Sequence, residues 1–311
     1  MNAVPSVSVV IPSYNCAGYL ARALDSVLSQ DYPAERVEVV VVDDGSRDDS
    51  PAIVRAYAER NPRVHLLQQA NAGPAAARNR AIGASHGELV AFLDADDRWL
   101  PGKLTAQVAL YSADPALGLI YCGCRFVDSS GRPVERWVRR QQALRGHILL
   151  DFVCDFFLVT STIVVPRRCL DVVGWFDPSL RVSEDNDLFL RLLLRYRADL
   201  VDAPLIERTI RADSLSRCDY ALDAHSDLDV LDRFLAAQPA FARRHRQRID
   251  ARYAQCLYDF GYRLLEDGAI APARHALLRS LRRQASLRAV KALVRSTLPA
   301  PTVRWLRGST S

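Results

Sequence analysis

Residues 87–97 read GELVAFLDADD and carry the main evidence for both the fold and the chemistry. The apolar run at 89–93 has the length of a strand buried on both faces, and it ends in three carboxylates. Asp94, Asp96 and Asp97 would repel one another there unless a cation or ordered hydrogen-bond donors compensate their charge. Hard oxygen ligands in an open site favour Mg²⁺ or Mn²⁺, completed by phosphate oxygens and water. The alternative is a turn in which Asp97 caps a following helix.

Strand-like and helix-like segments alternate through the first hundred residues. Strands are expected at residues 7–11, 37–42, 64–67 and 89–93, and helices at 21–29, 52–60 and 75–85. Short links between such segments are typical of a mostly parallel sheet covered by helices on both faces. Polar residues follow three of the strands, at 12–15, 43–46 and 94–97, and ligands of such sheets bind outside the carboxyl ends. The sequence therefore predicts an α/β domain in which these three strand ends meet at one site.

The rest of the chain is less regular at first and then helical. The middle offers a strand at 119–127, a turn at 128–131, an apolar stretch at 162–165 and a helix at 187–194. From 220 to 296 the spacing is helical, with breaks expected near 238–239, 268 and 271–272. Residues 253–287 suit a pair of packed helices. We expect a catalytic domain at 1–218, with a nucleotide-binding half (1–115) and an acceptor half (116–218), followed by a helical, basic region at 219–311.

Charge is unevenly spread along the 311 residues. The whole chain has a net charge of +5, yet residues 239–311 hold 15 Lys or Arg against four acids. Such asymmetry suggests an anionic partner for the tail, and an amphipathic face with Leu278, Leu281 and Arg282 favours an anionic membrane. The alternatives are a solvated helical surface, a lid on the catalytic domain or an oligomer contact. No nucleic acid is expected, because the catalytic part is acidic and no recognition motif is present.

The remaining features indicate a cytoplasmic protein, which the basic tail could place peripherally on the inner face of the membrane. The N-terminus has no basic region before an apolar run, so no signal peptide is expected. The apolar stretch 149–165 is interrupted by Asp151 and Asp155 and is too short to span a bilayer. Seven cysteines without a CxxC pair indicate neither a zinc site nor a disulfide framework, and reduced thiols fit the cytosol.

Two further acidic segments hold candidate site residues. Asp43 and Asp44 close a buried strand, either as capping acids of a turn or as acceptors for a base edge or a sugar hydroxyl. There is no GxGxxG and no GxxxxGK[ST], so a nucleotide would not be held by a glycine-rich cradle, although Tyr14 could stack on a base. Residues 183–187, SEDND, precede an amphipathic helix. They either interact with its dipole or hold a general base that takes a proton from a hydroxyl.

Five segments in this order resemble the inverting family 2 glycosyltransferases, which have the GT-A fold. They are VSVVIPSYN (7–15), VVVVDDGS (39–46), NAGPAAARN (71–79), GELVAFLDADD (87–97) and SEDND (183–187). Each segment is weakly specific by itself, but the ordered set is highly specific and covers about residues 5–216. The resemblance implies a GT-A, Rossmann-like catalytic domain.

The resemblance also implies roles for individual residues. Nucleotide-sugar binding falls to Pro12, Tyr14 and Asp44 around the base, Arg78 in the segment that closes over the nucleotide, Asp94 near the ribose or the metal, and Glu184 beside the sugars. Asp96, with Asp94, would bind Mn²⁺ or Mg²⁺ on the diphosphate, and Asp185 would be the general base. Many members carry a histidine after the base motif; here Arg211 stands in that stretch and could pair with phosphate instead.

The function implied is a single displacement that transfers a hexosyl or N-acetylhexosaminyl group with inversion. The donor would be a nucleotide-sugar, by family habit a UDP-sugar. The acceptor would be a glycan or a lipid-linked oligosaccharide in cell-surface polysaccharide synthesis. One alternative is a nucleotidyltransferase, but residues 12–16 (PSYNC) replace the glycine-rich, basic loop that such an enzyme would carry. The other is a catalytically silent glycan-binding or scaffold protein with a working basic tail, against which the intact acids argue.

Overall fold

The computed structural model describes residues 4–134, 144–210 and 220–297. The chain divides into two compact units, Met1–Phe152 with Phe156–Ser214, and Val153–Asp155 with Leu215–Ser311. The domain boundary expected at 218–219 lies outside the described residues.

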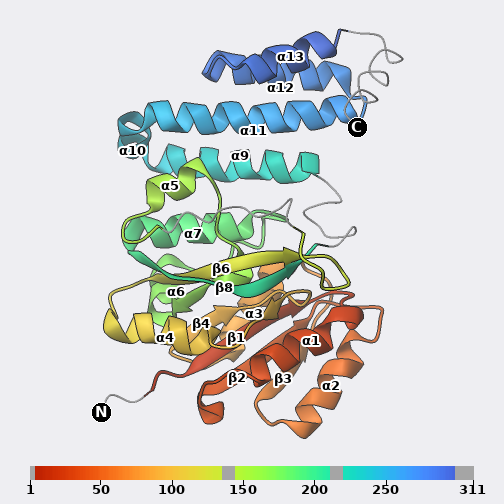
Figure 1. Cartoon of the computed structure of the whole chain (residues 1–311), viewed down its shortest axis with the longest axis vertical. Helices are drawn as coiled ribbons and strands as arrows, with labels where there is room; N and C mark the ends of the chain where they lie inside the picture. Colours follow the sequence, from red (N-terminus) through yellow and green to blue (C-terminus); the bar gives the residue numbers. More distant parts are fainter. Residues whose placement is uncertain (1–3, 135–143, 211–219, 298–311) are drawn as a thin grey trace. The chain divides into compact units, whose positions relative to one another are not determined.

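The first unit is built on an eight-stranded sheet with the order β3-β2-β1-β4-β7-β6-β8-β5. Figure 1 labels β1, β2, β3, β4, β6 and β8 of this sheet. The strands are β1 (Val7–Ser13), β2 (Val37–Asp43), β3 (Val64–Gln68), β4 (Leu89–Phe92), β5 (Arg98–Trp99), β6 (Leu119–Val127), β7 (Val164–Pro166) and β8 (Ala198–Thr209). Neighbours from β3 to β4 run parallel, as do β6 and β8. β7 is antiparallel to β4 and β6, and β5 is antiparallel to β8. The predicted α/β class with a mostly parallel sheet is confirmed.

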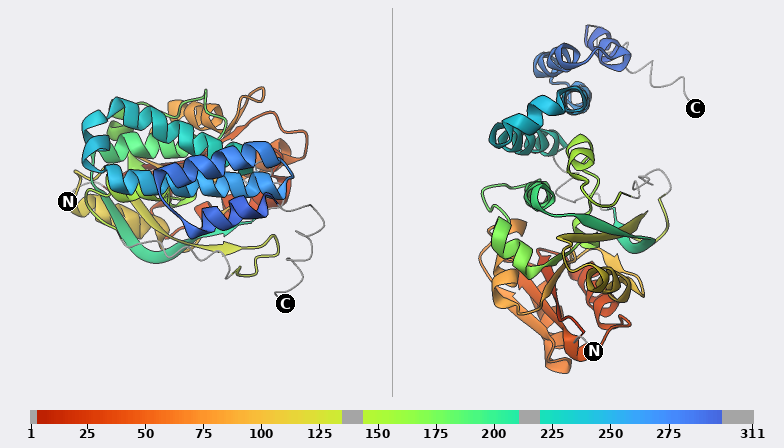
Figure 2. Two further views of the ribbon diagram at one scale, coloured as in Figure 1. Left: turned by 90° about the horizontal axis from the view of Figure 1, so that it is seen from above. Right: turned by 90° about the vertical axis from the view of Figure 1, so that its left-hand side faces the viewer.

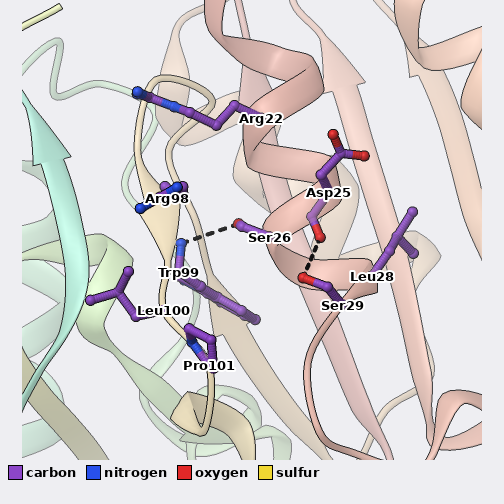
Figure 3. A pocket seen from close by; sticks show the side chains of 9 residues that line it. All are labelled: Arg22, Asp25, Ser26, Leu28, Ser29, Arg98, Trp99, Leu100 and Pro101. Carbon is purple, nitrogen blue, oxygen red and sulfur yellow. Dashed lines mark hydrogen bonds between the residues drawn. The ribbon is translucent and has the colours of Figure 1, made fainter. Parts of the chain in front are cut away.

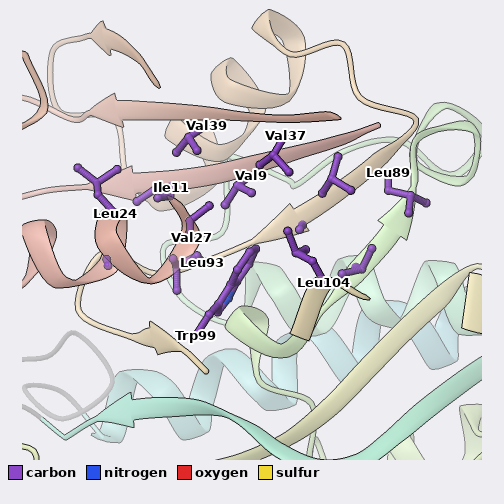
Figure 4. Close-up of a cluster of buried hydrophobic side chains, with 14 of the residues drawn as sticks. Val9, Ile11, Leu24, Val27, Val37, Val39, Leu89, Leu93, Trp99 and Leu104 are labelled. Carbon is purple, nitrogen blue, oxygen red and sulfur yellow. The ribbon is translucent and has the colours of Figure 1, made fainter. Parts of the chain in front are cut away.

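Helices cover both faces of this sheet. They are α1 (Ala17–Leu28), α2 (Ser50–Arg60), α3 (Pro74–Ala84), α4 (Lys103–Ala113), α6 (Arg167–Val173) and α7 (Glu184–Arg195); α5 (Leu149–Cys154) crosses the division between the units. A large apolar cluster joins one face of the sheet to α1, α2 and α4, with Trp99 buried in it (Figure 4). Because strand side chains alternate, Val10 and Phe92 lie on the other face, where the Phe92 ring packs edge-on against Phe176.

The predicted elements of the first hundred residues are all present, with ends shifted by a few residues. Two strands and three α-helices of the described residues were not predicted: β5, β8, α4, α5 and α6. β8 carries acids and Pro204 and lacks a clean alternation, and its pairing with β6 shifts register around Gly123. Its strand conformation therefore depends on the partner strand more than on its own pattern.

Gly87 is a position where the fold leaves no room for a side chain. A Cβ there would lie 2.4 Å from the Ser8 backbone nitrogen and 2.5 Å from Ser8 Oγ. We expect Gly87→Ala to lower the free energy of unfolding by about 1–3 kcal/mol, because the entry to β4 must move away from β1. Gly18→Ala, where a Cβ would meet nothing within 4 Å, is the matched control and should keep or raise stability. Equal urea midpoints for the two variants would contradict this packing argument.

The second unit is a stack of helices: α9 (Tyr220–Ala237), α10 (Pro239–Arg244), α11 (Arg246–Glu266), α12 (Ile270–Arg283) and α13 (Leu287–Arg295). α11 packs against both α9 and α12, and α12 packs against α13 (Figure 2). The packed pair expected over 253–287 is thus confirmed. The break expected at 271–272 is wrong, because Pro272 falls in the first turn of α12, where its missing N–H is tolerated. The chain breaks at 284–286 instead. Among the described residues, no helix has both the length and the apolar character needed to cross a membrane.

Candidate active site

The carboxyl ends of β1, β2 and β4 lie together because the three strands are parallel neighbours. Hydrogen bonds tie the loops that follow β1 and β2. The Asp44 nitrogen donates to the Ser13 carbonyl at 2.8 Å, and the Asn15 nitrogen donates to Ser46 Oγ at 2.9 Å. Tyr14 stands exposed in this loop, at 45% of its possible surface. The ring is therefore available for stacking, as its predicted role requires, and Pro12 lies two residues before it at the end of β1.

Asp44 is buried and organises the loop before α3. Its carboxylate accepts hydrogen bonds from Gln69 Nε2 at 2.8 Å, from the Ala72 nitrogen at 2.9 Å and from the Gly73 nitrogen at 2.8 Å. Two of the donors are backbone groups, so the side chain holds the shape of the chain at 69–73. The predicted contact of Asp44 with the nucleotide base stays a prediction.

Arg78 links two acids that are far apart in the sequence. Its Nη2 lies 2.7 Å from Asp94 Oδ1 and its Nη1 lies 2.6 Å from Glu184 Oε1. The guanidinium is buried beside the Phe176 ring, 5.3 Å from the centroid. Burial raises the pKa of Glu184 in spite of this positive neighbour. Arg78 therefore joins the strand end after β4 to the start of α7; its contact with a nucleotide stays a prediction.

Asp97 anchors the acidic loop rather than a helix. Ser161 Oγ donates to Asp97 Oδ2 at 2.6 Å, and the Thr209 nitrogen donates to Asp97 Oδ1 at 3.0 Å. The nitrogen of Asp94 in turn donates to Ser161 Oγ at 3.1 Å. Burial, and then the charges of Asp96 and Asp94, raise the pKa of Asp97 well above its usual range. The alternative in which Asp97 caps a helix is wrong, because α4 begins after Gly102 without a side-chain cap.

Asp94 and Asp96 offer two carboxylates for a divalent ion. The Asp94 side chain is 30% exposed although it pairs with Arg78. In the described part of the chain, no group of three or more His, Cys, Asp or Glu side chains could hold a metal by itself. A donor set of this kind fits Mg²⁺ or Mn²⁺ that takes its other oxygen ligands from phosphate and water.

The N-terminus of α7 presents the predicted base motif. Asp185 Oδ2 accepts a hydrogen bond from Thr160 Oγ1 at 2.7 Å, and Oδ1 accepts one from the Asn186 nitrogen at 2.8 Å. Asp187 pairs instead with Arg191, one turn further along the helix, at 2.7 Å. The acids of this first turn also lie at the positive end of the helix dipole. The position of the motif is therefore compatible with both interpretations, stabilisation of the helix and a general base. Asp185 keeps lone pairs for a proton from a ligand.

Three site residues carried no recognisable signal in the sequence. Thr160 and Ser161 hold Asp185 and Asp97, and both belong to a short turn before β7. Arg208 lies on β8. Burial lowers the pKa of its guanidinium, but the charges of Asp97, Asp94 and Asp185 outweigh this effect and raise the pKa above its usual value. Arg208 brings a positive charge to the acids from a strand that was not predicted. Arg211, the predicted phosphate partner, lies outside the described residues.

A groove of about 900 Å³ lies between α1 and residues 98–101, which follow the acidic loop in the sequence (Figure 3). Arg22 lines it and reaches the loop from this side: its Nη2 donates to the Asp96 carbonyl at 3.2 Å and to Thr209 Oγ1 at 2.7 Å. The groove holds none of the predicted site acids. The groove is therefore separate from the carboxylates. Arg22 stabilises their loop through the Asp96 backbone carbonyl.

Comparison with known sequences places this site in a family. Residues 8–163 match the family model described as glycosyl transferase family 2. The chain is 32% identical over 267 residues to the succinoglycan biosynthesis protein ExoU of Rhizobium meliloti, across 79% of this chain and 76% of that protein. It is 30% identical to the putative teichuronic acid biosynthesis glycosyltransferase TuaG of Bacillus subtilis, across 61% of this chain and 72% of that protein.

Solved structures share the fold at lower identity. S. aureus TarS 1–349 in complex with UDP superposes with a TM-score of 0.59 at 21% identity, over 97% of this chain and 91% of that chain. The mannosyltransferase PcManGT from Pyrobaculum calidifontis, in complex with GDP-Man and Mn²⁺, superposes with a TM-score of 0.62 at 22% identity, over 98% and 84%. At such identities the likeness establishes the GT-A type of fold.

Proposed function

The chain belongs to glycosyl transferase family 2, and we propose that it is an inverting enzyme that moves a sugar from a UDP-sugar to a hydroxyl group. The sugar would be a hexosyl or an N-acetylhexosaminyl group. The observation that carries this proposal is the chain of contacts from Asp94 through Arg78 to Glu184, next to Asp185. It brings the acids expected at the donor diphosphate to the residue expected to activate the acceptor. The family membership leaves the nucleotidyltransferase alternative without support.

The proposed reaction is a single displacement. Asp185 takes the proton of the acceptor hydroxyl while the oxygen attacks the anomeric carbon from the face opposite the nucleotide. The new C–O bond forms as the bond to the diphosphate oxygen breaks, so the configuration inverts. Thr160 keeps the Asp185 carboxylate in place through its hydroxyl. Asp94 and Asp96 would hold Mn²⁺ or Mg²⁺, which supplies positive charge for the diphosphate when bound.

Residues from both halves of the catalytic domain would bind the nucleotide-sugar. Tyr14 would stack on the base with Pro12 and Asp44 beside it, and Glu184 would hold a sugar hydroxyl. Arg211, and Arg208 on β8, would offer positive charge to the phosphates. The similar solved structures include complexes with UDP, UDP-GlcNAc and GDP-Man, which supports a nucleotide-sugar donor for this chain.

We propose a glycan or a lipid-linked oligosaccharide as the acceptor, in the synthesis of a cell-surface polysaccharide. The names of the relatives, succinoglycan and teichuronic acid biosynthesis proteins, support this class of product. Residues 1–115 would make most of the donor contacts, and residues 116–218 would bind the acceptor and complete the donor site with Glu184, Arg208 and Arg211. Residues 219–311 would make peripheral contact with an anionic membrane. The enzyme would then act on the cytoplasmic face of that membrane.

Removing Asp96 tests the donor site directly. We expect calorimetry to find one nucleoside diphosphate among UDP, GDP and TDP that binds more tightly with Mn²⁺. Asp96→Ala should weaken that metal-dependent binding by at least about tenfold, because one of two protein ligands is lost. Asp171→Ala, which removes an exposed acid on α6, is the control and should bind as the parent does. If no nucleotide binds with or without Mn²⁺, the silent glycan-binding alternative replaces this proposal.

A further inference from the structure

Helix α13 has two apolar sides, and the described residues cover only one of them. Ala289 and Ala292 are buried against Leu277 of α12. Leu287, Val290 and Val294 stand at 70%, 43% and 57% of their possible exposure. Their spacing of three and four residues puts them on one stripe of the helix. Three neighbouring bare aliphatic side chains on a nine-residue helix are unusual unless something covers them.

The charge around this stripe has a single sign. From residue 268 to the last residue, the sequence contains no Asp or Glu. Arg288 and Lys291 are exposed on α13, and Arg279 and Arg282 are exposed on α12. Leu278 of α12 is also exposed, at 45% of its possible surface. None of these four cations pairs with an acidic side chain of the described chain. In contrast, Arg283 pairs with Asp250 at 2.8 Å and is already neutralised.

We infer that α13 docks in the plane of an anionic lipid bilayer. Leu287, Val290 and Val294 would enter the boundary between headgroups and acyl chains, and Arg288 and Lys291 would contact lipid phosphates. A bare aliphatic stripe flanked by unpaired cations is the pattern of interfacial helices. A helix of this length cannot cross a bilayer, so it would lie on the surface. The inference rests on the proposed membrane contact and identifies the surface that makes it.

Lipid fits this surface better than other polyanions. Nucleic acid would satisfy the cations but would leave the three aliphatic side chains in water, because it offers them a charged backbone. A bilayer with anionic headgroups satisfies both kinds of group at the same depth. Binding to the bilayer would also bring the enzyme to the surface where a lipid-linked acceptor is found, as the proposed function requires.

The experiment is flotation of the full-length protein with lipid vesicles. We expect binding to vesicles that contain phosphatidylglycerol and at least about tenfold weaker binding to pure phosphatidylcholine. Val290→Asp with Val294→Asp should lower binding by at least about tenfold, and Arg288→Glu with Lys291→Glu should do the same. The matched control is Val172→Asp, an equally exposed valine (55%) on α6 of the first unit, which should leave binding unchanged. Circular dichroism confirms that each variant is folded.

Each outcome decides between occupants of the surface. Loss of binding in both pairs of variants, but not in Val172→Asp, supports the inference. Binding that survives Val290→Asp with Val294→Asp and is abolished by salt would mean plain anion attraction and would overturn it, as would absence of vesicle binding. Hydrolysis of the nucleotide-sugar in the same preparations reports on the catalytic unit alone. Intact hydrolysis without vesicle binding would therefore refute this surface and leave the proposed reaction standing.

Discussion

Asp185→Asn is expected to abolish sugar transfer while donor binding stays close to that of the parent protein. The asparagine carbonyl can still accept the hydrogen bond from Thr160 Oγ1, so the geometry at the start of α7 should survive. What is lost is the basicity that removes the acceptor proton. Loss of a positioned general base costs about 10²–10⁴-fold in kcat. Steady-state kinetics with a fixed acceptor and varied donor will separate kcat from the KM for the donor.

The control for this variant lies two residues away. Asp187→Asn changes the same type of side chain in the same turn, but Asp187 pairs with Arg191 and not with the strand ends. It should keep kcat within a few-fold of the parent value. If Asp185→Asn turned over at a near-normal rate, the assignment of Asp185 as the base would be wrong, and Glu184 would be the next residue to replace.

Arg78→Met is expected to destabilise the catalytic unit strongly. It would leave Glu184 buried and Asp94 partly buried without their shared counter-charge, at side-chain exposures of 8% and 30%. Breaking a buried ion pair by removing one partner costs about 3–5 kcal/mol. Urea unfolding should show a loss of that order. Arg80→Met, which removes an exposed arginine of the same helix, should change stability by less than about 1 kcal/mol.

Two further measurements separate charge from packing in this variant. Arg78→Met combined with Glu184→Gln should recover part of the lost stability, because the uncompensated buried charge is gone. The deficit of Arg78→Met should also shrink as the pH falls. Burial raises the pKa of Glu184 even beside Arg78, and removal of this positive charge should raise it further. The folded variant therefore gains more stability on acidification than the parent does. A deficit independent of pH and of Glu184→Gln would show that Arg78 matters only as a packed side chain.

The pairing of the two halves of the site was beyond sequence reasoning. Arg78 and Glu184 are 106 positions apart, and each belongs to a helix whose local pattern predicts only a helix. Thr160 and Ser161 reach Asp185 and Asp97 because β7 inserts antiparallel between β4 and β6. No periodicity within the segment 160–166 specifies that insertion. The position of Arg208 was equally unpredictable, because β8 adopts its strand conformation by pairing with β6.

Local patterns in the sequence determined the alternating strands and helices, the α/β class and the polar strand ends at 12–15, 43–46 and 94–97. Their meeting at one edge follows from the rule that neighbouring parallel strands end together, so no contact had to be known in advance. The tertiary structure alone decided that Arg78 neutralises Asp94 and Glu184, that Asp97 supports the loop, and that α13 keeps a bare apolar stripe. These features depend on which distant segments pack together. Burial and charge compensation over the whole chain determine that packing, and local residue spacing contains no information about it.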